Sequence, residues 1–213
     1  MSTYKNIDCV YWINLKKSLE RKKVFEEETL PIFSNFNTQR FEAVDMTAEH
    51  TSRRRTAGCS LSHLSCWRHA MISKYNNIVI LEDDLKCTMG QEDIEGMIEG
   101  LFEKHPNFTV CNLAYNHLGE NKPERKLSTG FYNFENIQTT SAYVAKVDFL
   151  NSIYLHMMES AMNLFLGGDT ELYAIDTSWK TFQKDINWLC SEKIGYQRAS
   201  FSEIEKHYTD YGV

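Results

Sequence analysis

Three consecutive carboxylates, Glu82, Asp83 and Asp84, follow a run of four branched apolar residues at 78–81. The apolar run does not alternate with polar residues, which predicts a strand buried on both faces of a sheet. The acids then lie at the carboxyl end of that strand, where open α/β sheets bind their ligands. Adjacent carboxylates repel one another, and a divalent cation relieves that repulsion. The stretch therefore predicts a metal or substrate site, with a solvated acidic turn as the alternative.

Two basic or polar stretches could add to such a site. The three arginines at 53–55 are typical of a solvated loop, although guanidinium groups also bind phosphate oxygens with two N–H groups at once. Gly58 and the serines after it predict a helix start whose free backbone N–H groups favour phosphate. His63 lies one turn into that helix, and taken alone it is typical of a structural histidine.

Alternating strands and helices must position these residues. Strand patterns occur at 8–15, 40–44, 78–84, 108–113, 139–147, 187–190 and 194–198. Helical patterns occur at 18–29, 91–105, 148–166 and 169–183, in addition to the helix that begins at Gly58. The alternation over the first half of the chain predicts a parallel sheet of βαβ type, whereas the second half is more mixed. Residues 115–130 are polar and interrupted by Gly and Pro, which favours a mobile lid or a binding loop.

Composition narrows the class of protein. The chain has 213 residues, of which 42% are hydrophobic and 24% charged, as in a globular protein. A net charge of −6 argues against a protein that coats nucleic acid. Its six cysteines form no C-x-x-C pair, which disfavours a structural zinc site. With neither a signal peptide nor an apolar run that could span a bilayer, we expect a cytoplasmic protein without a membrane span.

Five blocks of the sequence resemble, in one order, those of glycosyltransferase family 25, the lipooligosaccharide and collagen galactosyltransferase group. They are VYWINLKKSLERK, GCSLSHLSCWRHAM, IVILEDDL, TTSAYVAKVDFL and QRASFSEIEKHY, and together they extend from about residue 9 to 208. The chain also resembles the N-terminal glycosyltransferase domain of large multidomain enzymes of Chlorella viruses. That likeness implies a viral protein in the host cytosol and further domains of a longer polypeptide.

The family resemblance implies a GT-A fold, an α/β/α sandwich with a mainly parallel central sheet. One domain would span residues 1–213, with a nucleotide-binding half over about 1–115 and an acceptor half over about 116–213. It implies a hexosyltransferase that uses Mn²⁺ or Mg²⁺ and a nucleotide-sugar, expected to be UDP-linked. The acceptor would be a glycan or glycoprotein, and nucleic acid would not be a partner.

Metal roles follow from the same resemblance. Glu82, Asp83 and Asp84 match the Asp-x-Asp motif, with Glu in place of the first Asp. Asp84 is then the main metal ligand, and Glu82 and Asp83 share contacts to the metal and the ribose. A late histidine completes the metal site in several GT-A enzymes, which makes His207 a further candidate ligand; an exposed helical histidine is the alternative.

Substrate contacts are implied for five more residues. Asn14, Leu15 and Arg21 match the opening block and would contact the base and ribose. Ser60 and His63 match the second block and would approach the diphosphate or the donor sugar.

The acceptor side is less defined. Asp176 and Asp169 are the candidates for a catalytic base, with surface helix acids as the alternative. Tyr143, Tyr173 and Trp179 are candidates for the wall of a sugar subsite, since aromatic rings stack on sugar faces. Two other functions stay open at this point: a metal-dependent phosphohydrolase and a non-catalytic domain that binds sugar nucleotides.

Overall fold

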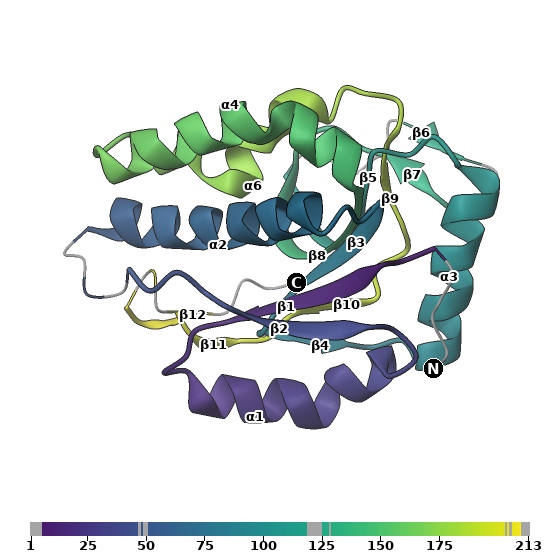
Figure 1. Ribbon diagram of the computed structural model, residues 1–213, viewed down its shortest axis with the longest axis horizontal. Coiled ribbons are helices and arrows are strands. Elements are labelled where there is room, and N and C mark those ends of the chain that lie inside the picture. The colour runs from purple at the N-terminus through teal and green to yellow at the C-terminus, as the bar shows by residue number, and fades with distance from the viewer. Residues whose placement is uncertain are drawn as a thin grey trace.

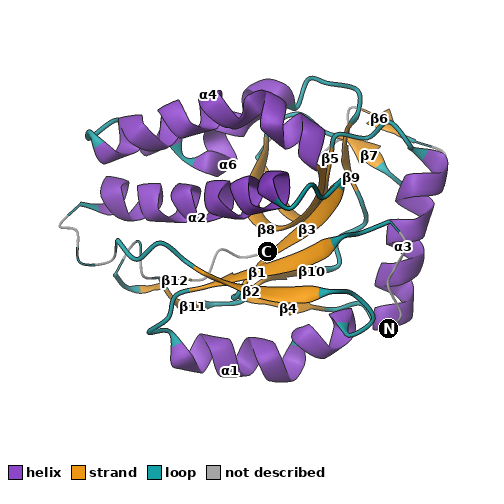
Figure 2. Cartoon of the chain, viewed as in Figure 1, coloured by secondary structure: helices purple, strands orange, loops and turns teal. Residues whose placement is uncertain are grey.

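A central eight-stranded sheet organises the protein (Figures 1 and 2). The computed structural model describes residues 6–46, 48, 51–118, 125–127, 129–202, 204 and 206–209. In spatial order the strands are β2 (Thr38–Glu42), β1 (Cys9–Asn14), β3 (Asn77–Glu82), β8 (Ile137–Lys146), β5 (Val110–His117), β9 (Trp188–Cys190), β7 (Tyr132–Asn133) and β6 (Arg125–Lys126). Strands β2, β1, β3, β5 and β9 run in one direction, and β8 lies antiparallel between β3 and β5. The predicted sheet, mainly parallel in direction, is confirmed.

Helices cover both faces of this sheet. On one face lie α2 (Ser52–Ile72), α4 (Val147–Phe165), α5 (Thr170–Tyr173), α6 (Ile175–Ser178) and the 3-10 turn η2 (Trp179–Phe182). On the other face lie α1 (Leu19–Glu28), the 3-10 turn η1 (Leu30–Phe33) and α3 (Gln91–Lys104). This α/β/α sandwich confirms the predicted GT-A-like architecture.

Strand β3 shows why its sequence lacks alternation. Val79 and Leu81 join the core cluster under α1 and α3, whereas Ile78 and Ile80 join the cluster under α2 and α4. All four side chains are fully buried. Burying one such side chain contributes about 1.5–3 kcal/mol, so the strand is anchored from both faces. Its carboxyl end, where the acids begin, is therefore held in place.

The start of α2 differs from the prediction. The arginines at 53–55 were expected in a solvated loop, but α2 begins at Ser52, where the Thr51 hydroxyl accepts a hydrogen bond from the backbone N–H of Arg54. Gly58 thus lies inside the helix, and its predicted role at a phosphate-binding helix start is wrong. Its small size matters for packing, because an added Cβ would lie 3.0 Å from the carbonyl oxygen of Val44.

Other boundaries also differ. The helix predicted over 169–183 is broken into α5, α6 and η2, because Ala174 adopts an extended ψ of 146°. Asp169 caps α5, because its side chain accepts a hydrogen bond from the backbone N–H of Glu171 at 3.0 Å. Strand β2 begins at Thr38, two residues before the predicted start. Part of the predicted loop at 115–130 lies outside the described residues, namely 119–124 and 128.

The last part of the chain returns to the end of β3. Strand β10 (Gly195–Gln197) pairs with β4 (Leu85–Cys87), which directly follows the acidic residues. A short hairpin of β11 (Ser200–Phe201) and β12 (Tyr208–Thr209) follows. All six cysteines are free thiols. None of the helices in the described ranges has the length and apolarity needed to cross a membrane.

Two glycine substitutions test the packing of α2. Gly96→Ala, at an exposed position of α3 with open space around it, should raise the free energy of unfolding by about 0.5–1 kcal/mol. Gly58→Ala gains the same helix propensity, but its Cβ meets the Val44 carbonyl and Met46, so it should lower that free energy by about 1 kcal/mol or more. Urea denaturation measures both changes. Equal stabilisation by the two substitutions would contradict the close packing at Gly58.

Candidate active site

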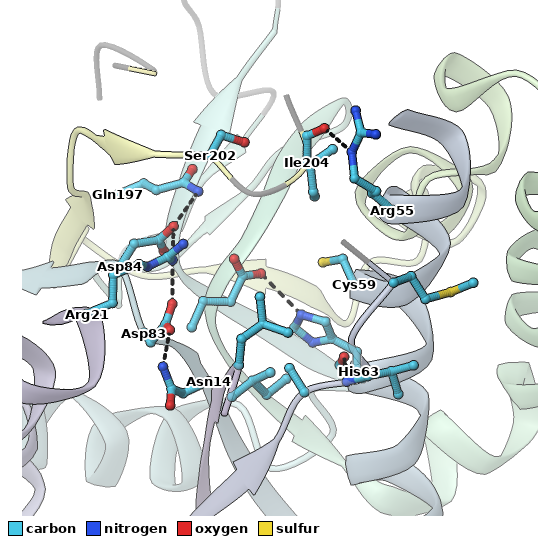
Figure 3. Close-up of a pocket in the computed structure, with 17 residues that line it drawn as sticks. Asn14, Arg21, Arg55, Cys59, His63, Asp83, Asp84, Gln197, Ser202 and Ile204 are labelled. Atoms are coloured by element: carbon cyan, nitrogen blue, oxygen red, sulfur yellow. Dashed lines mark hydrogen bonds and ion pairs between the residues drawn. The ribbon is translucent and has the colours of Figure 1, made fainter. Parts of the chain in front are cut away.

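A pocket lies at the carboxyl ends of β1 and β3, where Ile13 of β1 pairs in parallel register with Glu82 of β3 (Figure 3). It encloses about 830 Å³ of empty volume, part of it open to solvent. Helix α2 borders one side with Arg55, Cys59 and His63. The returning chain closes another side with Gln197, Ser202 and Ile204. Segments far apart in sequence thus meet around the three acids.

Asp83 and Asp84 are buried beside one arginine of α1. The Arg21 guanidinium forms ion pairs with both carboxylates, at 2.7 Å in the case of Asp84. Asn14, at the end of β1, donates its amide N–H to Asp83 at 2.5 Å. Gln197 donates its amide N–H to Asp84 at 3.0 Å. The acids are therefore positioned by three separate segments of the chain.

Glu82 ends a chain of buried hydrogen bonds. The Trp67 indole N–H can only donate, and it bonds the Tyr143 hydroxyl at 2.8 Å. The Tyr143 O–H is then directed to Nδ1 of His63, 3.0 Å away, which leaves the ring proton on Nε2. Nε2 lies 3.1 Å from Glu82 Oε1, and this oxygen also accepts the Thr140 hydroxyl at 2.6 Å. His63 therefore orients Glu82 toward the pocket.

The crowding of acids changes their pKa values. Burial raises the pKa of Asp83 to about 6, against the opposing effect of the Arg21 charge. Burial also raises the pKa of Asp84. Burial opposes ionisation of Glu82 as well, but its contacts with His63, Thr140 and Arg21 lower its pKa overall. A further positive charge at this site would favour the ionised form of all three acids.

The donor atoms fit a divalent cation. Within the described part of the chain, Oδ1 of Asp84 is buried without a hydrogen-bond partner. A buried carboxylate oxygen left in this way is costly, and a cation would satisfy it. Cys59, His63 and Glu82 form a neighbouring group whose possible ligand atoms lie within 4.8 Å of one another. Hard cations such as Mg²⁺ and Mn²⁺ prefer oxygen ligands, which favours Asp84 with Glu82.

The structure brings together most of the predicted binding residues. The pocket is lined by Asn14, Leu15, Arg21, His63, Glu82, Asp83 and Asp84. Ser60 is buried and donates its hydroxyl to the Thr56 carbonyl at 3.3 Å, whereas Cys59 and Ser62 line the pocket. His207 is exposed and is absent from the described residues that line the pocket.

The acceptor-side candidates separate into two groups. Asp176 lines a second cavity next to the pocket, and burial raises its pKa. Asp169 is exposed and caps α5. Tyr143 and Trp179 are fully buried, so the prediction that they line a sugar subsite is wrong. Tyr173 is half-buried outside both cavities.

The three adjacent arginines have roles that the sequence did not separate. Arg53 donates to the Gly167 carbonyl at 3.0 Å and Arg54 to the Phe165 carbonyl at 3.2 Å, so both satisfy groups at the end of α4. Arg55 lines the pocket and donates to the Ile204 carbonyl at 2.6 Å, which ties the returning chain to α2. The predicted solvated loop is replaced by a helix whose arginines contact two other segments.

The contact of Gln197 with Asp84 was not predicted from the sequence. Gln197 approaches Asp84 only because β10 pairs with β4, more than a hundred residues earlier in the chain. Nothing in its local sequence indicates that contact.

Comparison with known proteins identifies the family. The model of glycosyltransferase family 25 (LPS biosynthesis protein) matches residues 53–159, half of the chain. The chain belongs to glycosyltransferase family 25. It is therefore a glycosyltransferase, and the matched range contains all of α2 except Ser52, β3 with its acids, β8 and most of α4. No curated protein matches the chain significantly by sequence.

One solved structure supports the fold of this family 25 protein. A glycosyltransferase involved in the glycosylation of the major capsid of PBCV-1 is similar at 10% identity with a TM-score of 0.55, covering 93% of this chain and 95% of that one. An apo UDP-glucose pyrophosphorylase has 11% identity, a TM-score of 0.48 and coverages of 88% and 73%. A Drosophila galactosyltransferase with manganese, UDP-Gal and xylobiose has 9% identity, a TM-score of 0.42 and coverages of 97% and 71%. The last two likenesses are too weak to support a conclusion about this chain.

Removal of one hydroxyl group tests the series of side-chain hydrogen bonds that ends at Glu82. Tyr143→Phe keeps the ring but leaves Trp67 Nε1 and His63 Nδ1 without their partner. We expect the free energy of unfolding to fall by about 2 kcal/mol or more, measured by urea denaturation. Tyr154→Phe, on a half-buried ring of the same core cluster, should change it by less than about 0.5 kcal/mol. Equal effects of the two substitutions would contradict the role of the Tyr143 hydroxyl.

Proposed function

We propose that this glycosyltransferase moves a hexose from a UDP-linked donor to a glycan or glycoprotein acceptor with the help of Mn²⁺ or Mg²⁺. One observation carries the proposal: three acids are crowded at the end of β3, and a buried oxygen of Asp84 has no hydrogen-bond partner among the described residues. Buried carboxylates in this arrangement require positive charge. A cation bound to a nucleoside diphosphate would supply that charge.

The bound cation would stabilise the negative charge that develops on the diphosphate leaving group as the glycosidic bond breaks. Asp84 and Glu82 would hold it, since Asp84 has the unsatisfied oxygen and His63 orients Glu82. Asp83, fixed by Asn14, is the acid we assign to the ribose. Asn14 and Leu15 border the same pocket at the end of β1, where the base and ribose would lie.

Arg21 has two possible anionic partners in this proposal. Without ligand it pairs with both Asp83 and Asp84, so it neutralises the charge that a cation would otherwise neutralise. A cation that binds Asp84 competes with this ion pair, and the guanidinium then becomes available for diphosphate oxygens. Binding of cation and nucleotide should therefore be positively coupled through Arg21.

Two further roles stay proposals. Asp176, which lines the cavity next to the pocket, is our candidate for the group that contacts the acceptor hydroxyl, ahead of the exposed cap Asp169. His207 belongs to the exposed returning chain, and its role as a late metal ligand stays a prediction.

Calorimetry with UDP tests the metal requirement. UDP should bind at least about tenfold more tightly with Mn²⁺ than in EDTA, because the cation links the phosphates to the acids. Asp84→Asn keeps the side-chain size and should abolish this difference. Asp93→Asn, which removes an exposed acid from the first turn of α3, is the control and should retain it. Equal UDP affinity with and without metal in the unmodified protein would contradict the proposal.

Substitution of Arg21 tests the coupling. Arg21→Gln should bind Mn²⁺ about tenfold more tightly than the unmodified protein when UDP is absent, because competition for the carboxylates is lost. UDP affinity should fall at the same time. Electron paramagnetic resonance of free Mn²⁺ measures the first effect, and calorimetry measures the second.

Arg198→Gln is the matched control. Arg198 lines a third cavity, which α1 borders and which Asp83 and Asp84 also line, but its guanidinium pairs with Glu28 at 2.9 Å. The substitution removes the same charge from the region without breaking an ion pair to the acids. Equal changes in Mn²⁺ affinity for both variants would show a general charge effect and contradict the specific role of Arg21.

A further inference from the structure

A second cavity adjoins the active-site pocket. It encloses about 1380 Å³ of empty volume, part of it open to solvent. The two cavities share four lining residues, Cys59, Glu82, Gln197 and Ile204. A molecule in the second cavity would therefore lie next to the ligand of the first, with Glu82 between them.

The lining of this second cavity suits a ligand with many hydroxyl groups. Six side chains offer hydroxyl groups, namely Ser52, Thr56, Thr139, Thr140, Thr170 and Thr177. Asn116 and Gln138 add amide groups. Hydroxyl and amide groups both donate and accept hydrogen bonds, as the hydroxyl groups of a saccharide also do.

Charge distinguishes the two cavities. Glu82, Glu171 and Asp176 line the second cavity, and none of the described residues that line it is basic. The active-site pocket also contains acids, namely Glu82, Asp83 and Asp84, but it differs in having two arginines, Arg21 and Arg55. An anionic ligand would thus be repelled from the second cavity and accepted on the arginine side. The arrangement separates a diphosphate from an uncharged partner.

A strained residue fixes the acids of the second cavity. Thr139 has a φ of +73°, which is unusual for a β-branched residue and occurs where surrounding structure imposes it. Its backbone N–H donates to Asp176 Oδ2 at 3.2 Å, and the hydroxyl of the next residue, Thr140, bonds Glu82. Strand β8 changes register against β5 in this stretch, as bulged strands do next to functional sites.

We propose that the second cavity is the acceptor subsite and that it takes an uncharged saccharide, whose hydroxyl groups hydrogen-bond to Asp176 and to the neighbouring threonines. The inference rests on the proposed function, because it assigns the second substrate of the same reaction. It adds the chemical class of that substrate, namely a neutral sugar in preference to a phosphorylated or carboxylated one.

Saturation-transfer NMR on the full chain tests the proposal. The probes are methyl galactoside and methyl glucoside as neutral sugars, and methyl glucuronide and glucose 6-phosphate as anionic ones, with UDP and Mn²⁺ present. We expect the neutral glycosides to bind at least about tenfold more tightly than the anionic ones at low salt. Asp176→Asn should weaken binding of the neutral glycosides about tenfold, because a charged hydrogen-bond acceptor is lost.

Reversing the charge of one acid in the second cavity should increase the affinity for anionic glycosides. Glu171 is an exposed acid of the cavity, and Glu171→Lys should improve binding of the anionic glycosides several-fold, by about the effect of one partly screened charge. Glu159→Lys is the matched control, since Glu159 is exposed on α4 outside the described lining of the cavity, and it should change nothing.

Three results would overturn the acceptor subsite: no glycoside binds, anionic glycosides bind as well as neutral ones, or Asp176→Asn leaves neutral binding unchanged. Calorimetry with UDP in the absence of saccharide, with and without Mn²⁺, tests the donor proposal separately. If the protein binds neutral sugars but not UDP, the donor proposal is overturned and the sugar subsite is kept. If UDP binds only with Mn²⁺ and no saccharide binds, the acceptor subsite is overturned and the donor proposal is kept.

Discussion

Crowding of three adjacent carboxylates at the end of β3, two of them buried and Glu82 partly buried, is the constraint on which the rest of the site depends. Two of them are held by the Arg21 guanidinium, and the third is oriented by His63 and Thr140. Each of these partners comes from a different element, so the acids connect α1, α2 and β8 at one point. Charge compensation in a poorly solvated place is worth more than at the surface, because water screens it less. A site built in this way is specified by electrostatics as much as by shape.

The same constraint organises the two cavities around Glu82. Two arginines lie with Asp83 and Asp84 on the pocket side, whereas the side of Asp176 has acids, hydroxyl groups and amides without a basic residue among its described lining. The proposed reaction brings an anionic donor and a hydroxyl-rich acceptor to one point. The arginines of the pocket match the proposed anionic donor, and the strained backbone of Thr139 holds Asp176 on the side of the second cavity.

Packing supports this arrangement from below. Helices cover both faces of β3. The strand therefore cannot shift, and its acids stay close to their partners. Gly58 allows α2 to approach the segment after β2 closely, which brings Cys59 and His63 to the pocket. Arg53 and Arg54 fasten the start of α2 to the end of α4, and Arg55 ties it to Ile204.

The sequence alone predicted the elements whose residues interact locally: the buried strand before Glu82, the alternation of strands and helices, and the position of the three acids at the end of that strand. These depend on periodicity and on neighbouring residues, which the sequence displays directly. It did not predict that Arg53–Arg55 are helical, that Tyr143 and Trp179 are buried, or that Gln197 bonds Asp84. Only the tertiary structure decided these, because each depends on contacts between residues far apart in the chain.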